Sequence, residues 1–247
     1  MKLVTLTAEE SAFARSLVIH EDPEVIALNK PPGLSSQGGR IAVRTLDELL
    51  AAFAKPSGVR PRLIHRLDRD TSGVIVAARS QPAAAFLGKA MMARRIRKTY
   101  LAIVAPGAPQ PRGGTVEAAL RKESQGREAS MRVCSGDHPE AQAALTRYRT
   151  LAADETAAVV ELSPRTGRMH QLRVHMASIG RPIAGDPRYG GALVLGGVPV
   201  PRLMLHAQAL VFPHPSGGEI RIEAPIPADM ATLIASIGET LVATEAG

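Results

Sequence analysis

The segment "HRLDRDTSG", residues 65 to 73, groups side chains that could act as acids, bases or nucleophiles. Asp68 lies between Arg66 and Arg69, with His65 close by, so neighbouring positive charge should lower its pKa and keep the carboxylate ionised. An ionised carboxylate in basic surroundings suits a nucleophile or a general base. A structural ion pair is the alternative interpretation, because such pairs shift pKa values without taking part in chemistry.

A second group of basic side chains lies in the segment 163 to 191 and raises the question of a metal site. Its members are Arg165, Arg168, His170, Arg173 and His175. The two histidines are five residues apart, which is ~140° around a helix or opposite faces of a strand. Neither geometry suits paired metal ligands, and the HExxH pattern of zinc hydrolases is absent from the sequence. The sequence therefore predicts no metal.

The same group could instead bind an anion. His170 and Arg173 are three residues apart and would lie on neighbouring faces of a helix, with Arg168 at or just before the first turn. Backbone N–H groups are free at a helix N-terminus, so basic side chains there complete a site for an anionic group. A solvated basic helix explains the pattern equally well, and the residues alone leave both interpretations open.

Long motifs along the chain resemble one known family. "HRLDRDTSGVIVAAR" is similar to the HRLDxxTSG signature of pseudouridine synthases of the RluA type, and "LSPRTGRMHQLRVHMASIGRPIAGDPRYG" is similar to their TGRxHQ[IL]RVHxxxxGxPIxGDxxYG block. Shorter matches are "VIALNKPPGL", "RKTYLAIV", "LTRYRTL" and "RLMLHAQALVFPHP". The motifs follow the family order from about residue 17 to about residue 227.

The resemblance implies roles for particular residues. Asp68 would be the catalytic aspartate, Arg173 the arginine that pairs with it, and Tyr100 the tyrosine that stacks on the target base. The residues that would bind RNA are Arg66, Arg168 and His170. The family detaches uracil from C1′ of the ribose and rejoins it through C5, with neither metal nor organic cofactor. Attack of the carboxylate on the sugar and abstraction of the C2′ proton remain alternative routes.

Three other functions compete with this one. A catalytically silent RNA-binding module on the same core would not need the combination of Asp68, Tyr100 and Arg173. A glycosidase would need a second acidic group, and its candidates, Asp70 and Asp186, resemble turn residues. A structural protein of the ribosome would explain the basic charge but not the motif around the aspartate.

The strands and helices that the sequence predicts must position these residues. Expected strands cover 24 to 30, 73 to 79, 98 to 105, 144 to 151, 157 to 163, 202 to 212 and 218 to 224, and expected helices cover 44 to 54, 81 to 95, 169 to 180 and 227 to 238. This order favours an α+β fold with a large mixed, mostly antiparallel sheet flanked by helices. The resemblance adds a central RNA-binding catalytic cleft.

Composition agrees with an RNA partner. The chain has 30 Lys and Arg against 23 Asp and Glu, a formal net charge of +7, and a sequence pI near 10.1. An excess of positive charge favours a polyanion, because each neutralised phosphate releases counterions. Aromatic residues make up 3% and Trp is absent, so recognition should depend on arginine contacts and RNA shape more than on stacking.

The rest of the sequence sets the expected organisation. We expect one catalytic domain over residues 1 to 247, without the S4-like RNA-binding domain that many family members carry ahead of the core. No apolar stretch suits a signal peptide or a membrane span, so we expect a cytoplasmic, monomeric protein. Its single cysteine, Cys134, lies in a polar segment and is expected to be a bystander.

Three segments bear on which RNA is bound. Residues 120 to 142 are polar and weakly patterned, so they predict a mobile loop or a hairpin that clamps a ligand, or else a tolerated insertion. Arg181 stands where the family often has a histidine, and "SSQGG" replaces the commoner Val-His-Pro after "PPGL". Both departures are expected to lie away from the chemistry. Ribosomal and transfer RNA remain alternative targets.

Overall fold

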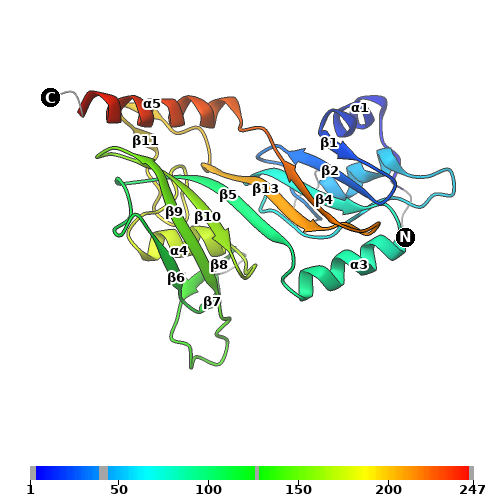
Figure 1. Cartoon of the computed structure of the whole chain (residues 1–247), viewed down its shortest axis with the longest axis horizontal. Helices are drawn as coiled ribbons and strands as arrows, with labels where there is room; N and C mark the ends of the chain where they lie inside the picture. The colour runs from blue at the N-terminus through cyan, green and yellow to red at the C-terminus, as the bar shows by residue number, and fades with distance from the viewer. Residues whose placement is uncertain (1–3, 39–43, 126–127, 245–247) are drawn as a thin grey trace. The chain divides into compact units, whose positions relative to one another are not determined.

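A computed structural model describes residues 4–38, 44–125 and 128–244, and it divides the chain into two compact units. The first unit comprises Met1–Lys98 and Ala207–Pro225, and the second comprises Thr99–His206 and Ile226–Gly247. Each unit has its own strands and helices (Figure 1). Among the described helices, none combines the length and the hydropathy that crossing a membrane requires.

The first unit is built on strands in the order β1, β2, β4 and β13, with β14 paired to β13 and the short β3 paired to β4. Their bounds are Val18–Glu21 (β1), Val25–Lys30 (β2), Arg62–Leu63 (β3), Ser72–Ala78 (β4), Leu205–Pro213 (β13) and Glu219–Glu223 (β14). Its helices are α1 (Ala8–Ser16), α2 (Leu46–Leu49), the 3₁₀-helix η1 (Leu50–Phe53) and α3 (Gln81–Met92). Every residue of β4 is buried, as its unbroken run of small and apolar residues predicts.

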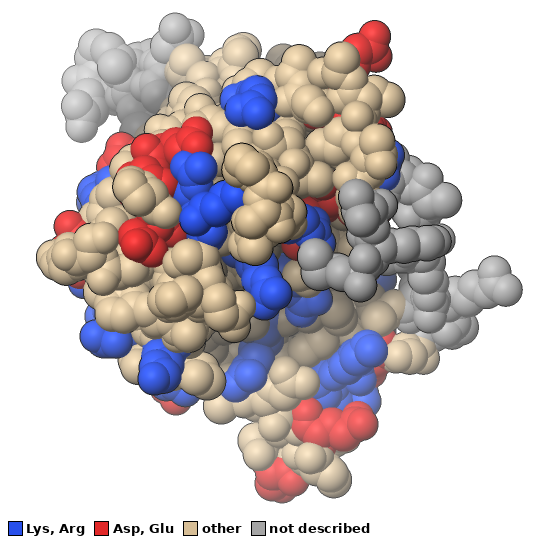
Figure 2. Space-filling view, turned by 90° about the vertical axis from the view of Figure 1, so that its right-hand side faces the viewer, with Lys and Arg blue, Asp and Glu red and all other residues tan. Residues whose placement is uncertain are grey.

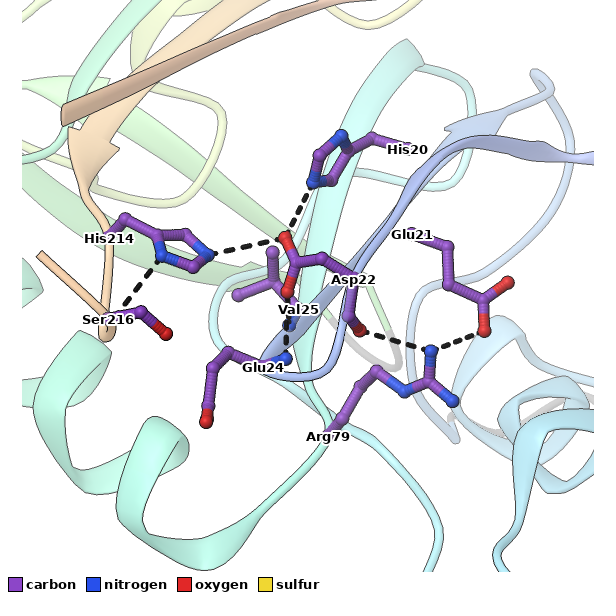
Figure 3. A network of polar contacts seen from close by, with 8 residues as sticks. All are labelled: His20, Glu21, Asp22, Glu24, Val25, Arg79, His214 and Ser216. Carbon is purple, nitrogen blue, oxygen red and sulfur yellow. Dashed lines mark hydrogen bonds and ion pairs between the residues drawn. The ribbon is translucent and has the colours of Figure 1, made fainter. Parts of the chain in front are cut away.

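A network of polar contacts ties the turn between β1 and β2 to the end of β13 (Figure 3). Asp22 Oδ1 accepts hydrogen bonds from the backbone N–H groups of Glu24 and Val25, at 2.7 and 2.9 Å. Its other oxygen, Oδ2, lies 2.6 Å from Nε2 of His20 and 3.2 Å from Nε2 of His214. Burial raises the pKa of Asp22, but the His20 and backbone bonds more than offset it and lower that pKa to about 2.

Among its described residues, the second unit has four strands in the order β5, β10, β9 and β6, all paired antiparallel, and two separate two-stranded hairpins. The four strands are β5 (Arg97–Val104), β6 (Gly113–Glu117), β9 (Leu145–Ala153) and β10 (Ala158–Pro164). The hairpins are β7 (Leu120–Gln125) with β8 (Glu128–Val133), and β11 (Val194–Leu195) with β12 (Val198–Pro199). Helix α4 (Gln171–Ser178) contacts β8, and α5 (Ala228–Thr244) contacts β9 and β10.

The predicted fold class is confirmed: the chain is α+β, with mostly antiparallel strands flanked by helices. Each strand and helix expected from the sequence is present, although the helix expected at 44 to 54 is divided between α2 and η1. Helix α1, strands β1, β3 and β6 and the β11–β12 hairpin were not expected. The single catalytic domain and the central cleft stay predictions.

Residues 120 to 142, of which 126 and 127 lie outside the described residues, contain the β7–β8 hairpin and a following turn. The two strands pair from Leu120 opposite Val133 to Gln125 opposite Glu128. The hairpin was one of the alternatives that the polar pattern allowed. A cross-strand ion pair helps to explain the pairing, because Glu123 of β7 binds Arg132 of β8 at 2.6 Å, while a second ion pair joins Glu123 to Arg121 within β7.

Candidate active site

Asp68 lies in the first unit, in the segment between β3 and β4, and a buried side chain bonds the backbone on each side of it. The Ser36 hydroxyl donates to the carbonyl of Leu67 at 2.7 Å and accepts from the N–H of Leu67 at 3.1 Å. The Lys30 ammonium donates to the carbonyl of Arg69 at 2.9 Å. Residues 67 and 69 are therefore fixed, and the backbone of Asp68 is held between them.

Lys30 is fully buried at the end of β2 and needs partners for its charge. Besides Arg69, it donates to the carbonyls of Pro31 and Leu34, at 2.9 and 2.8 Å. One ammonium group thus joins the "PPGL" turn to the Asp68 segment. This explains in physical terms why a lysine ends an otherwise buried strand.

A turn at Arg69 and Asp70 follows Asp68 and leads into β4. The N–H of Thr71 donates to the carbonyl of Asp68 at 3.1 Å. Gly73 has φ +114°, and a Cβ atom there would lie 2.2 Å from the carbonyl oxygen of Ala207 in β13. Only glycine fits this close approach, so the glycine of the "TSG" motif allows the segment to pack against the sheet.

The expected positive surroundings of Asp68 are only partly present. Burial, with a smaller effect from Lys98, lowers the pKa of His65 to about 3, so its ring is uncharged at neutral pH. Its Nε2 accepts the N–H of Val76 at 3.2 Å. Arg69 pairs with Asp70 through bonds of 2.9 and 3.2 Å. His65 is therefore a structural residue rather than a source of charge, which corrects the interpretation of the motif.

Arg173 lies in α4 of the second unit and forms a buried ion pair with Asp186. Its Nε and Nη2 atoms donate to the two oxygens of Asp186 at 2.7 and 2.8 Å. Burial raises the pKa of Asp186, but the Arg173 pair and two backbone N–H bonds more than offset it, so that pKa is lowered. Asp186 is therefore ionised, and it does not suit the role of a glycosidase's general acid.

Tyr189 contacts the same arginine. The Arg173 guanidinium carbon lies 5.0 Å from the centroid of the Tyr189 ring, within the range of a cation–π interaction. The Tyr189 hydroxyl lies 2.8 Å from Nδ1 of His170 and accepts the N–H of Met131 at 3.0 Å. The "GDPRYG" segment thus supplies both an ion-pair partner and an aromatic partner to Arg173.

His170 and His175 have separate partners. His170 caps α4 in a left-handed conformation with φ 51°. His175 is fully buried, with Nδ1 2.9 Å from Thr146 Oγ1 and Nε2 3.1 Å from the Ala118 carbonyl oxygen. Burial lowers the pKa of His175. Within the described residues, no group of three or more His, Cys, Asp or Glu could hold a metal ion.

The remaining predicted site residues lie on three different elements. Tyr100 is in β5 and 8% exposed. Arg66 is exposed in the Asp68 segment, and Arg168 is exposed just before α4, where its Nε donates to the Ala143 carbonyl at 3.2 Å. Asp68 and Arg66 belong to the first unit, whereas Tyr100, Arg168, His170 and Arg173 belong to the second. The pairing of Asp68 with Arg173 stays a prediction.

Sequence reasoning missed four residues around these side chains. They are Lys30, Ser36, Asp186 and Tyr189. A lysine within an apolar run was a usable signal for the first, because a buried ammonium needs several acceptors. Asp186 was assigned to a turn, and it does accept the N–H of Arg188 and Tyr189, but it also binds Arg173.

The two departures from the family motifs have structural explanations. Ser36, from "SSQGG", contacts the residue before Asp68 and so lies nearer to the proposed chemistry than expected, while the last glycine of that segment is outside the described residues. Arg181 donates to the carbonyls of Ala108 and Gly180, at 2.9 and 2.8 Å. It therefore stabilises a loop contact within the second unit.

The basic charge is distributed over the surface rather than confined to the motifs. Figure 2 shows Lys and Arg side chains spread across one face of the molecule, with groups of acidic side chains among them. Several arginines there and elsewhere are neutralised by exposed ion pairs, such as Arg97 with Glu219 at 2.7 Å. Charge alone therefore does not define a single binding surface.

This chain is similar in sequence to known RNA pseudouridine synthases. Residues 24–178 match the RNA pseudouridylate synthase family. RNA pseudouridine synthase 4, mitochondrial, of Arabidopsis thaliana is 40% identical over 202 residues, which are 74% of this chain and 42% of the plant protein. Ribosomal large subunit pseudouridine synthase C of Salmonella typhimurium is 38% identical over 225 residues, 88% of this chain and 69% of that protein.

Solved structures extend the similarity to the fold. The structure titled Human RNA Pseudouridylate Synthase Domain Containing 4 superposes with a TM-score of 0.78 and 26% identity, covering 93% of this chain and 97% of that one. The structure titled Human RNA Pseudouridylate Synthase Domain Containing 1 has a TM-score of 0.68 and 30% identity, covering 85% and 83% of the two chains.

Proposed function

Because the chain belongs to the RNA pseudouridylate synthase family, we propose that it isomerises specific uridines of structured RNA with Asp68 as the catalytic carboxylate. The chain is a pseudouridine synthase of the RluA type, an RNA isomerase. One observation carries the role of Asp68: buried Ser36 and Lys30 bond the backbone of the residues on either side of it. Such anchoring is what a reacting group requires.

The proposed reaction balances within the substrate. The bond between uracil N1 and ribose C1′ breaks, the base turns, and a bond between C5 and C1′ forms. C5 loses its proton and N1 gains one, so the product is an isomer and needs no oxidant or reductant. Asp68 serves either by attacking C1′ or by removing the C2′ proton, and both routes use the ionised carboxylate.

Tyr100 and Arg173 have supporting roles in this proposal. A uridine stacked in folded RNA must be flipped out before a side chain reaches C1′, at a cost of a few kcal/mol. The Tyr100 ring, on a strand, would stack on the extruded base. Arg173 would orient Asp68. Its pair with Asp186 uses Nε and Nη2, and a guanidinium has five N–H donors, so one arginine suits two carboxylates.

The same proposal covers RNA binding. Arg66, Arg168 and His170 would contact the RNA around the target uridine, and the net charge of +7 would add sequence-independent affinity. The names of the bacterial relatives point to large-subunit ribosomal RNA, and we propose that class of target here. A monomer in the cytoplasm stays our prediction, although the name of the Arabidopsis relative places that protein in mitochondria.

The test is isomerisation by the purified chain. Large-subunit ribosomal RNA lacking modifications, and an unmodified transfer RNA pool, would each be incubated with the protein, and pseudouridine would be mapped at nucleotide resolution. We expect product at defined positions of the ribosomal RNA. Product in transfer RNA alone would contradict the proposed target. Tight RNA binding with no product in either would support the silent RNA-binding module instead.

A further inference from the structure

The phenol of Tyr189 lies where three parts of the second unit meet: the segment after α4, strand β8 and the N-terminus of α4. Its hydroxyl accepts the N–H of Met131 in β8 at 3.0 Å and lies 2.8 Å from Nδ1 of His170. A backbone N–H can only donate, so the Tyr189 hydroxyl accepts from Met131 and forms a second hydrogen bond with the His170 ring.

Arg173 contacts the Tyr189 ring as well as Asp186. The guanidinium carbon lies 5.0 Å from the ring centroid, while Nε and Nη2 bind the two oxygens of Asp186. Asp186 Oδ1 also accepts the N–H of Tyr189 at 3.2 Å. Asp186 and the Tyr189 ring, which both contact Arg173, therefore belong to one four-residue segment and are held together by this hydrogen bond.

The hydrogen bond between Tyr189 and His170 bears on the backbone conformation at the start of α4. It is a non-glycine residue with φ 51° at the N-cap of α4, and its side chain makes no capping hydrogen bond. A left-handed conformation at such a residue is strained and persists only when the surroundings determine it. The hydrogen bond between His170 and Tyr189 is one of the contacts that determine it, and Arg173 follows three residues later on the same helix.

The β7–β8 hairpin is attached to the same segment twice. Besides the bond from Met131 to Tyr189, Arg188 Nη1 donates to the Ala129 carbonyl at 2.9 Å. The Met131 side chain is 2% exposed and belongs to a buried cluster against which Tyr189 packs. A shift of β8 would therefore move Tyr189, and with it both the N-terminus of α4 and the ring beside Arg173.

We propose that Tyr189 is a positioning residue: its ring and hydroxyl couple the β7–β8 hairpin to Arg173, so that the placement of the hairpin governs the orientation of this arginine. The inference deepens the proposed function and rests on it, because Arg173 acts there on the carboxylate of Asp68. On this proposal the β7–β8 hairpin affects the rate of the reaction and is not merely a tolerated surface insertion.

The test compares two tyrosines of the second unit. Tyr189→Phe keeps the ring beside Arg173 and removes the hydroxyl, whereas Tyr189→Leu removes both. Tyr148→Phe is the matched control, because the Tyr148 ring is buried and its hydroxyl donates to the Pro111 carbonyl at 3.2 Å. Single-turnover rates at saturating RNA, RNA affinities and melting temperatures would be measured for all three variants.

We expect Tyr189→Phe to lower the rate about tenfold and Tyr189→Leu about a hundredfold, as small misplacements of a positioned group do, while RNA affinity stays within about twofold. Tyr148→Phe should keep the wild-type rate at a similar melting temperature. If Tyr189→Phe reacted as fast as Tyr148→Phe, or lost affinity instead of rate, the positioning role would be wrong.

A structural measurement separates failure of this inference from failure of the proposed function. Amide hydrogen exchange at Met131 should be at least several times faster in Tyr189→Phe than in the wild type, and unchanged in Tyr148→Phe. The proposed function fails if the wild-type protein isomerises no uridine, and this exchange result does not depend on that activity. Unchanged exchange at Met131 in Tyr189→Phe would overturn the coupling whether or not the chain is active.

Discussion

Lys30 and Arg69 are joined by a hydrogen bond of 2.9 Å from a fully buried ammonium group to a backbone carbonyl, one residue after the proposed catalytic aspartate. The reciprocal bonds between Ser36 and Leu67 fix the backbone one residue before it. Neither contact touches a reacting atom. Together they show how a charged loop in front of a buried strand acquires one defined conformation.

Ser36→Ala should lower the free energy of unfolding by about 1–3 kcal/mol, because both the N–H and the carbonyl of Leu67 lose their partner in a buried site. Ser35→Ala is the matched control, since its backbone carbonyl, rather than its side chain, accepts the N–H of Leu46. Urea unfolding of both variants measures the difference. Equal stabilities would show that the Ser36 hydroxyl does not hold the loop.

Asp22 should make the protein less stable in acid. Its pKa is about 2 in the folded chain against 3.8 ordinarily, so its contribution is present above pH 4 and is lost as the pH falls towards 2. By linkage this contribution is at most about 2 kcal/mol, because solvent screens a carboxylate near the surface. Asp22→Asn should flatten the dependence of unfolding free energy on pH between 4 and 2.

The control for that experiment is Glu155→Gln, at an exposed residue outside the Asp22 network. It should leave the pH dependence in this window unchanged. If the unfolding free energy of Asp22→Asn depended on pH as steeply as that of the wild type, the contacts with His20 and His214 would not stabilise the folded chain.

Arg173→Lys should lower the single-turnover rate at saturating RNA by about 10². A lysine keeps the charge but forms neither the two-bond pair with Asp186 nor the guanidinium contact with the Tyr189 ring. Arg202→Lys is a close control, because Arg202 pairs with Asp229 through bonds of 2.7 and 2.8 Å in the same unit. Equal rate losses in the two variants would assign the Arg173 effect to general destabilisation.

Arg168→Ala should act on binding rather than on the chemical step. The residue is exposed just before α4, and loss of one phosphate contact reduces the salt dependence of affinity by a slope of roughly one. RNA affinity measured over a range of salt concentrations checks this, with the rate at saturating RNA as the second readout. An unchanged slope with a lower rate would place Arg168 in the catalytic group instead.

The regular elements were predictable because their patterns are local. The run "GVIVAAR" is apolar at almost every position, and β4 is buried throughout. The β7–β8 hairpin is one of several structures that its polar strands allow, and the cross-strand ion pair between Glu123 and Arg132 contributes to its pairing. Such cross-strand pairs are set by register, which the order of residues does not reveal.

The site was predictable in its residue types more than in its contacts. The motif supplies the proposed roles of Asp68 and Arg173, but the sequence did not indicate that His65 is uncharged, since that follows from burial. It also assigned Asp186 to a turn, although the same carboxylate binds Arg173 from the next segment. Contacts between segments depend on the folded arrangement. The sequence pattern shows only which side chains are present.

The most direct test of the central claim is the single-turnover rate of Asp68→Asn on ribosomal RNA, with Asp70→Asn as control. Asp70 is two residues away and paired with Arg69, so its substitution changes the same charge nearby without removing the proposed catalytic group. We predict no detectable pseudouridine from Asp68→Asn, RNA affinity within a few-fold of wild type, and near-normal rates from Asp70→Asn. Appreciable turnover by Asp68→Asn would contradict the account.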